Sequence, residues 1–151
     1  NIMHGNSSMK LTIELVPSTQ WGANLRAVLP KKDWDTLRKR CYQKASYKCE
    51  ICSDVGPKWP VECHEKWHYD DKKKVQTLTG LIALCPNCHL VKHFGRACSI
   101  GKKEKALNHF VAVNKCNLAA AQSYIRQVFE IWENRSKEPW SLDVSWLSSI
   151  I

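Results

Sequence analysis

The sequence contains no long hydrophobic run, which argues against a membrane-spanning helix. No apolar stretch is long enough to cross a bilayer, and the N-terminus lacks the basic, apolar and small-residue regions of a signal peptide. Internal repeats and low-complexity linkers are also missing. We therefore expect one domain over residues 9–151, preceded by a flexible lead or cloning scar at residues 1–8, with no membrane among its partners.

Acidic side chains are scarce relative to basic ones. The chain has 14 Asp and Glu against 23 Lys and Arg, which gives a net charge of +9 and a pI near 9.2. Such a surface favours an anionic partner, and nucleic acid is the commonest one. Solubility is the competing explanation, because charge alone does not specify a function.

The eight cysteines do not follow the spacing of a disulfide framework. Four of them form two CxxC knuckles, Cys49-Glu50-Ile51-Cys52 and Cys85-Pro86-Asn87-Cys88, which supply the ligands of a closed tetrahedral zinc site. The other four are scattered: Cys41, Cys63, Cys98 and Cys116. Zinc in a reducing compartment explains this pattern better than disulfides do. We therefore predict a structural Zn²⁺ held by Cys49, Cys52, Cys85 and Cys88, and an intracellular, cytoplasmic location.

Hydrophobic periodicity predicts an α+β fold. Apolar residues that alternate with polar ones indicate strands, and apolar residues at helical spacing indicate helices. The expected strands are Leu11–Leu15, Val61–Tyr69, Leu81–Leu84 and Trp140–Trp146. The expected helices are Asp33–Ala45, Pro86–Gly95 and a helical extension over residues 102–135 in which Asn117 caps the longer helix. We also expect the terminal strands to lie in one sheet.

Three histidines lie between and after the knuckles. His89 and His93 are spaced i, i+4, so on a helix they share one face. His64 is on the preceding strand and could supply a third ligand if that strand packs on the helix. Three neutral imidazoles with an open fourth position form a catalytic type of metal site. Affinity favours Zn²⁺ or Ni²⁺ there, and cellular availability favours Mn²⁺ or Mg²⁺. We interpret His68 and His109 as structural.

The segments CEIC, VECHE and LIALCPNCHLVKH, in this order, resemble the HNH, or ββα-metal, endonucleases of the four-cysteine zinc branch. The resemblance covers about Asp33 to Gly95. It implies a small ββα-metal core, here flanked by helices and terminal β-strands, with one catalytic divalent metal ion. By this resemblance His89 and His93 take the helical metal positions, His64 takes the strand metal position and Glu65 takes the place of the general base. If the alignment to the family is shifted by one residue, Cys63 becomes the metal ligand and His64 becomes the general base.

Two departures from the family pattern affect the expected activity. Glu65 stands where the family has the histidine that activates water. Gly80 stands where the family has the asparagine that braces the loop between the strands. A carboxylate is a weaker base near neutral pH unless its pKa is raised.

The residues expected to contact phosphates follow the knuckle: Lys92, Arg96, Lys102 and Lys103. A solvated surface is the alternative for them.

The sequence therefore predicts a metal-dependent endonuclease that hydrolyses phosphodiester bonds in DNA. One alternative is a catalytically silent zinc module that binds nucleic acid, which Glu65 and Gly80 favour. Another is an adaptor whose zinc holds a protein-binding surface, for which the seven tryptophans are the evidence. Nucleic acid, with DNA first, is the expected partner, and nothing else in the sequence indicates a protein partner.

Overall fold

The computed structural model describes residues 9–150 as a mixed α+β fold, which confirms the predicted class. The lead expected at residues 1–8 lies outside the described residues. The strands are β1 (Glu62–Asp70), β2 (Val75–Leu84) and β3 (Ser141–Asp143). The helices are α2 (Leu25–Val28), α3 (Lys31–Lys44), α4 (Pro86–Lys92), α5 (Phe94–Ser99), α6 (Lys103–Asn114) and α7 (Leu118–Arg135), with 3₁₀ turns η1 (Ser18–Gln20) and η2 (Ser145–Ser149).

A long hairpin of β1 and β2 forms the centre of the fold. The two strands pair antiparallel from Glu62↔Leu84 to Asp70↔Val75, with one bulge opposite Lys66 and Trp67. β3 adds to the other edge of β2 in parallel, so the sheet order is β1-β2-β3 and β1 is an outer strand.

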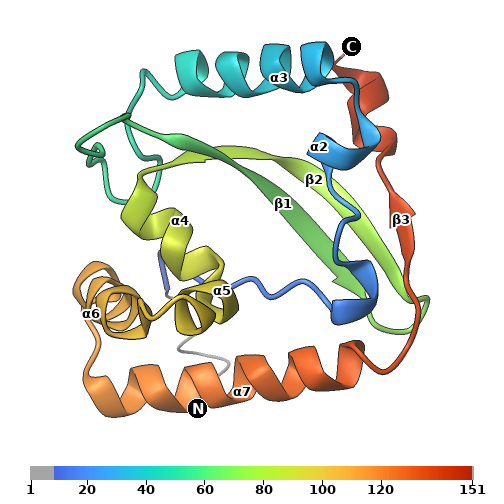
Figure 1. The fold of residues 1–151 in the computed structure, drawn as a ribbon. Helices are drawn as coiled ribbons and strands as arrows, with labels where there is room; N and C mark the ends of the chain where they lie inside the picture. The colour runs from blue at the N-terminus through green and yellow to red at the C-terminus, as the bar shows by residue number, and fades with distance from the viewer. Residues whose placement is uncertain (1–8, 151) are drawn as a thin grey trace.

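Helices cover the hairpin from two sides, and each side has its own core. In Figure 1, α3 lies along one side of the hairpin, and α4 to α7 lie on the other. The α3 side is filled around Trp34, Leu37 and Leu78, together with Leu147 from the C-terminal turn. On the α4–α7 side, a second cluster buries Phe94 and Phe110, among other residues. Both cores are apolar, so the hairpin is held between two hydrophobic layers.

The predicted strand at Leu11–Leu15 is wrong, although its alternation correctly indicated burial. Leu11 and Ile13 are buried. The backbone N–H of Ile13 donates to the Tyr124 hydroxyl, and that of Leu11 donates to the side-chain oxygen of Asn114. The segment therefore lies extended across the helices, and it does not share a sheet with the C-terminal strand.

Several other boundaries also differ from the prediction: the strand expected at Leu81–Leu84 begins at Val75, and the helix expected to be capped by Asp33 begins at Lys31. The helix that begins at Pro86 ends at Lys92, and Gly95 lies inside α5 instead of ending a helix. His93 breaks the axis with φ −98° and ψ 52°. The strand expected at Trp140–Trp146 is only Ser141–Asp143, after which the chain enters η2.

The helical extension agrees with the prediction, and Asn117 caps α7 by accepting from the Ala120 N–H at 2.8 Å. Among the described residues, no helix is long and apolar enough to cross a membrane.

Candidate metal centres

The two knuckles bring their four sulfur atoms together, as the sequence predicted. One ligand atom from each of Cys49, Cys52, Cys85 and Cys88 lies within 4.8 Å of the others. The first knuckle is fixed to the end of β2 because the Glu50 N–H donates to the Ala83 carbonyl at 2.9 Å, and the Ala83 N–H donates to the Glu50 carboxylate at 2.7 Å. The second knuckle begins directly after β2, with the Cys85 sulfur accepting from the Cys88 N–H at the start of α4.

The geometry of this cluster fits zinc. The Sγ atoms of Cys52 and Cys85 are 3.6 Å apart, and a tetrahedral ion with Zn–S bonds of about 2.3 Å places two sulfurs about 3.8 Å apart. Hydrogen bonds from the thiols of Cys85 and Cys88 hold the pKa of Cys49 well below its usual range, and the same contacts raise the pKa of Cys88. A divalent cation would displace the thiol protons that form these hydrogen bonds, since it binds cysteines as thiolates.

His109 contacts the zinc cluster, which its sequence position did not reveal. Its Nε2 lies 3.1 Å from the Cys88 sulfur, across the contact between α4 and α6. A ring N–H that donates to a ligating thiolate orients the ligand and lowers its charge density. We find no signal in the sequence for this contact, because the partners are far apart along the chain.

The second predicted cluster also forms. His64 of β1, His89 of α4 and His93 at the end of α4 each offer a ring nitrogen within 4.8 Å of the others. The Nε2 atoms of His89 and His93 are 3.1 Å apart, and two nitrogens on a tetrahedral ion with bonds of about 2.0–2.1 Å are about 3.4 Å apart. The hairpin places β1 against α4, which supplies the strand ligand that the spacing alone could not.

Carboxylates hold the outer nitrogens of two of these rings. The Glu62 carboxylate lies 2.9 Å from His89 Nδ1, and the Glu14 carboxylate lies 2.7 Å from His64 Nε2. The other ring nitrogen of His64, Nδ1, is buried without a hydrogen-bond partner among the described residues. A metal ion would satisfy this orphaned atom. Carboxylate–histidine pairs of this kind set the tautomer and orientation of metal ligands.

The electrostatics favour neutral imidazoles, as metal binding requires. Burial lowers the pKa of His93 to about 3, helped by repulsion from His89 and His64. Burial also lowers the pKa of His64, against the opposing effect of the Glu14 carboxylate. Burial raises the pKa of Glu14, but its contacts with His64 and Lys92 outweigh this and lower its pKa overall.

Glu65 is placed differently from His64. Its Oε2 accepts at 3.0 Å from the N–H of Leu25, the first residue of α2, whose N-cap is Asn24. Burial raises the pKa of the Glu65 carboxyl, and this outweighs the lowering effect of that N–H. Glu65, His64 and Cys63 all line one cavity, but Cys63 is not part of the histidine cluster.

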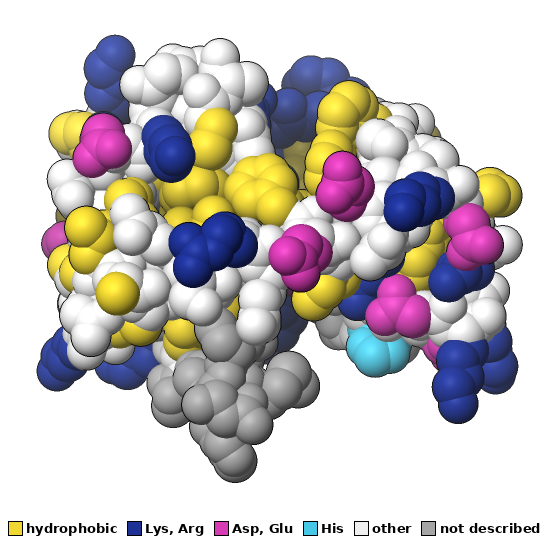
Figure 2. Space-filling view, turned by 90° about the horizontal axis from the view of Figure 1, so that it is seen from below, with side chains coloured by type: hydrophobic (Ala, Val, Ile, Leu, Met, Phe, Trp, Pro, Cys, Tyr) yellow, Lys and Arg dark blue, Asp and Glu magenta, His cyan; other side chains and the backbone are white. Residues whose placement is uncertain are grey.

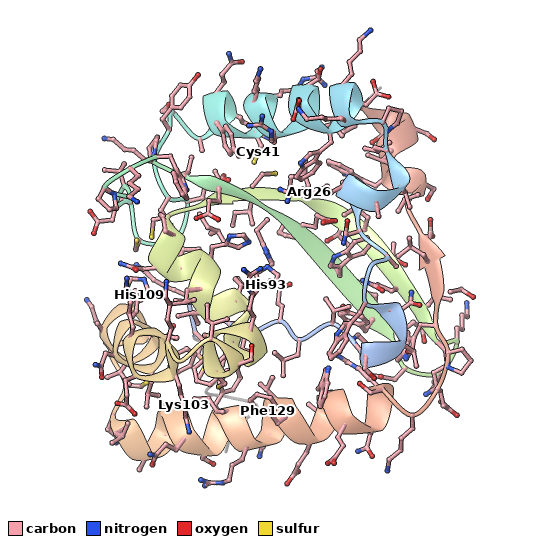
Figure 3. All side chains as sticks on the ribbon, viewed as in Figure 1. Arg26, Cys41, His93, Lys103, His109 and Phe129 are labelled. Carbon is pink, nitrogen blue, oxygen red and sulfur yellow. The ribbon has the colours of Figure 1, made fainter. Side chains whose placement is uncertain are left out.

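Lys92 does not lie on the surface, which corrects its expected role as a phosphate contact. The side chain is 7% exposed, and its ammonium lies 3.1 Å from the Glu14 carboxylate and donates to the Thr12 hydroxyl at 2.8 Å. Arg96, Lys102 and Lys103 are exposed. In Figure 3, Lys103 lies at the start of α6, away from His93. Of the four basic residues, only Arg96 borders the cavity beside the histidines.

A cavity of about 720 Å³ opens beside the histidine cluster. In Figure 3, His93 at the end of α4 and Phe129 of α7 face the central space between these helices, and Arg26 reaches from α2 over the strands; all three line the cavity. The α7 side of the molecule carries hydrophobic clusters between basic and acidic side chains (Figure 2), so the net positive charge does not make this face uniformly basic. Access to the histidines is therefore through a pocket of mixed chemistry.

No family model matches the chain, and neither a curated protein nor a solved structure matches it.

Proposed function

We propose that the protein is a metal-dependent endonuclease of the HNH type that hydrolyses phosphodiester bonds in DNA. The observation that carries this proposal is the convergence of His64, His89 and His93 at the edge of a solvent-open cavity. A structural zinc site has four protein ligands, whereas three imidazoles leave a coordination position for substrate or water. The hairpin packed on α4 is also the arrangement that the ββα-metal resemblance implies.

The residues of the chain would have separate roles in this reaction. His64, His89 and His93 hold the ion, while Glu14 and Glu62 keep the outer nitrogens of two rings occupied. A bound divalent ion would neutralise the charge that develops on the phosphate and on the leaving oxygen. Glu65 would accept the proton of the attacking water, and its raised pKa makes it a stronger base than an ordinary carboxylate.

The structure also supports the proposal at the position of the missing asparagine. β1 and β2 pair along almost their whole length, so Gly80 lies within a strand, opposite Lys66, and no long loop separates the strands. At the bulge, the Thr79 hydroxyl donates to the Lys66 carbonyl at 3.1 Å. This bond stabilises the bulge within the hairpin, where there is no loop for an asparagine to brace.

Plasmid nicking tests the function, with magnesium, manganese, nickel and zinc supplied in turn. Wild-type protein should nick with at least one ion, and His89→Ala should lose about 10³-fold or more in rate, since a catalytic metal contributes several kcal/mol. The matched control is His68→Ala, because His68 is exposed and outside the cluster. Equal nicking by wild type and His89→Ala would contradict the proposal.

A catalytically silent DNA-binding module is the second candidate, and one observation favours it. Glu65 already has a structural contact, because its carboxylate accepts from the Leu25 N–H at the start of α2. A silent module would bind DNA with strong salt dependence and cut with none of the four ions.

A further inference from the structure

The cavity beside the histidines has an aromatic wall that the metal chemistry does not use. Trp21, Trp132 and Phe129 line it together with His64 and His93. Trp21 is 69% exposed, the largest exposure among the large hydrophobic side chains of the described residues. Trp21 is therefore not a core residue, and packing of the interior does not explain why a tryptophan lies next to the histidine cluster.

The two tryptophans are held in place by the same backbone atom. The indole N–H groups of Trp21 and Trp132 both donate to the Val16 carbonyl, at 3.1 and 2.8 Å. Their rings stack with centroids 6.5 Å apart and planes 22° apart, and Phe129 packs edge-on against Trp132 at 6.3 Å. The ring planes are therefore fixed before any ligand arrives, which lowers the entropic cost of stacking a planar group on them.

Two arginines border the same cavity. Arg26 of α2 and Arg96 of α5 line it, and both are exposed. Within residues 9–150, neither guanidinium forms an ion pair or donates a side-chain hydrogen bond. Guanidinium groups match phosphate oxygens in a bidentate geometry. Glu65 also lines the cavity and is near enough to Arg26 for an electrostatic effect on its pKa, but the two form no ion pair, and Glu65 accepts from the Leu25 N–H. The Glu14 carboxylate already contacts Lys92 and His64.

We propose that this cavity binds an unpaired nucleotide of single-stranded DNA beside the scissile phosphate, with its base on the platform of Trp21 and Trp132 and its flanking phosphates at Arg26 and Arg96. The proposal rests on the nuclease function above and names its substrate class. In a duplex, each base face is covered by the neighbouring pairs, so an indole can reach a base only when that base leaves the stack. Fixed aromatic planes with free cations are the features that single-strand binding sites share.

The test measures binding by fluorescence anisotropy in a His89→Ala background, which prevents cutting. The probes are a labelled single strand and the same sequence as a duplex, at one fixed salt concentration. We expect the single strand to bind at least about 10-fold more tightly. Removal of one stacking side chain, Trp21→Ala, should weaken single-strand binding by about 5- to 100-fold and leave duplex binding unchanged.

Two further variants complete the design. Tyr47→Ala removes an aromatic side chain of 49% exposure outside the cavity and should bind both probes as its parent does. For the single strand, the slope of log affinity against log salt concentration should become less steep in Arg26→Ala. The change should correspond to the loss of about one phosphate contact. Thermal unfolding of each variant checks that the fold is intact, which the exposure of Trp21 and Arg26 favours.

The outcomes separate this proposal from the nuclease function. If wild-type protein nicks DNA but Trp21→Ala binds the single strand as well as its parent, the platform is wrong and the nuclease remains. Duplex binding that equals single-strand binding would also overturn the platform. Tighter binding of RNA of the same sequence would overturn the assignment to DNA. If no ion supports cutting of either the plasmid or the labelled single strand, and yet Trp21→Ala loses single-strand binding selectively, the platform stands and the nuclease function fails.

Discussion

The two candidate metal centres both take residues from α4, but they differ in what surrounds those residues. Cys85 and Cys88 at the start of α4 are almost fully buried and pair with a knuckle that β2 holds in place. His89 and His93 follow on the same helix but are partly exposed and face a cavity. A closed sulfur site stabilises the fold, whereas an open nitrogen site can exchange a ligand. Because the cysteines hold the start of α4, they also fix the positions of the two histidines that come from this helix.

The groups that contact the cysteines also differ from the groups that contact the histidines. Around the sulfurs the contacts are mainly backbone N–H groups and His109, which stabilise thiolates. Around the imidazoles the contacts are carboxylates, which raise the basicity of a neutral ligand. The first set would favour retention of an ion bound by thiolates, and the second set would support the catalytic ion that we propose for the histidines.

The largest expected effect comes from breaking the sulfur centre. Cys88→Ser should prevent stable folding, because structural zinc contributes about 10–16 kcal/mol of apparent binding energy, as much as the whole stability of about 5–15 kcal/mol of a typical domain. Circular dichroism and thermal unfolding measure this loss. Cys98→Ser is the matched control, since Cys98 is exposed and belongs to neither cluster. A folded Cys88→Ser protein with normal stability would show that the sulfur centre is not structural.

A smaller effect is expected when the open centre keeps its metal but loses its base. Glu65→Gln should reduce nicking by about 10²- to 10⁴-fold without loss of metal, because an amide oxygen can still accept from the Leu25 N–H at the start of α2. Nicking rates and metal content are measured on the same preparations. Glu130→Gln, an exposed change on α7, serves as control. An unchanged rate would assign proton transfer to another group.

The smallest effect concerns the outer contacts of the open centre. Glu14→Gln should weaken metal binding at the histidines by about 10- to 100-fold and leave the sulfur centre loaded. It also leaves the buried Lys92 ammonium without its counter-charge, so the variant should be less stable. Adding Lys92→Met should restore stability but not metal affinity. Recovery of both together would mean that Glu14 acts only as the partner of Lys92.

The sequence was sufficient for features set by local spacing. The knuckles, the pairing of His89 with His93 and the Asn117 cap each follow from residues a few positions apart. Features that depend on distant partners were not predictable. The segment at Leu11–Leu15 alternates like a strand, but side chains of α6 and α7 take its hydrogen bonds. Lys92 looked like a surface cation, yet Glu14 and Thr12 draw it into the interior.

The aromatic platform was missed for the same reason. Trp21 and Trp132 lie far apart in the chain and meet only because both donate to the Val16 carbonyl. Tryptophans in a sequence indicate buried or interface area, but they do not indicate which of them share a plane. The contact of His109 with Cys88 joins two helices in a similar way.

We expect one chain to hold two ions in two different kinds of site. Native mass spectrometry can count the metal ions per chain in wild type and in His89→Ala, after equilibration with zinc. Wild type should carry two ions per chain, and folded His89→Ala should carry one. A single ion in wild type, or two ions in His89→Ala, would contradict this expectation.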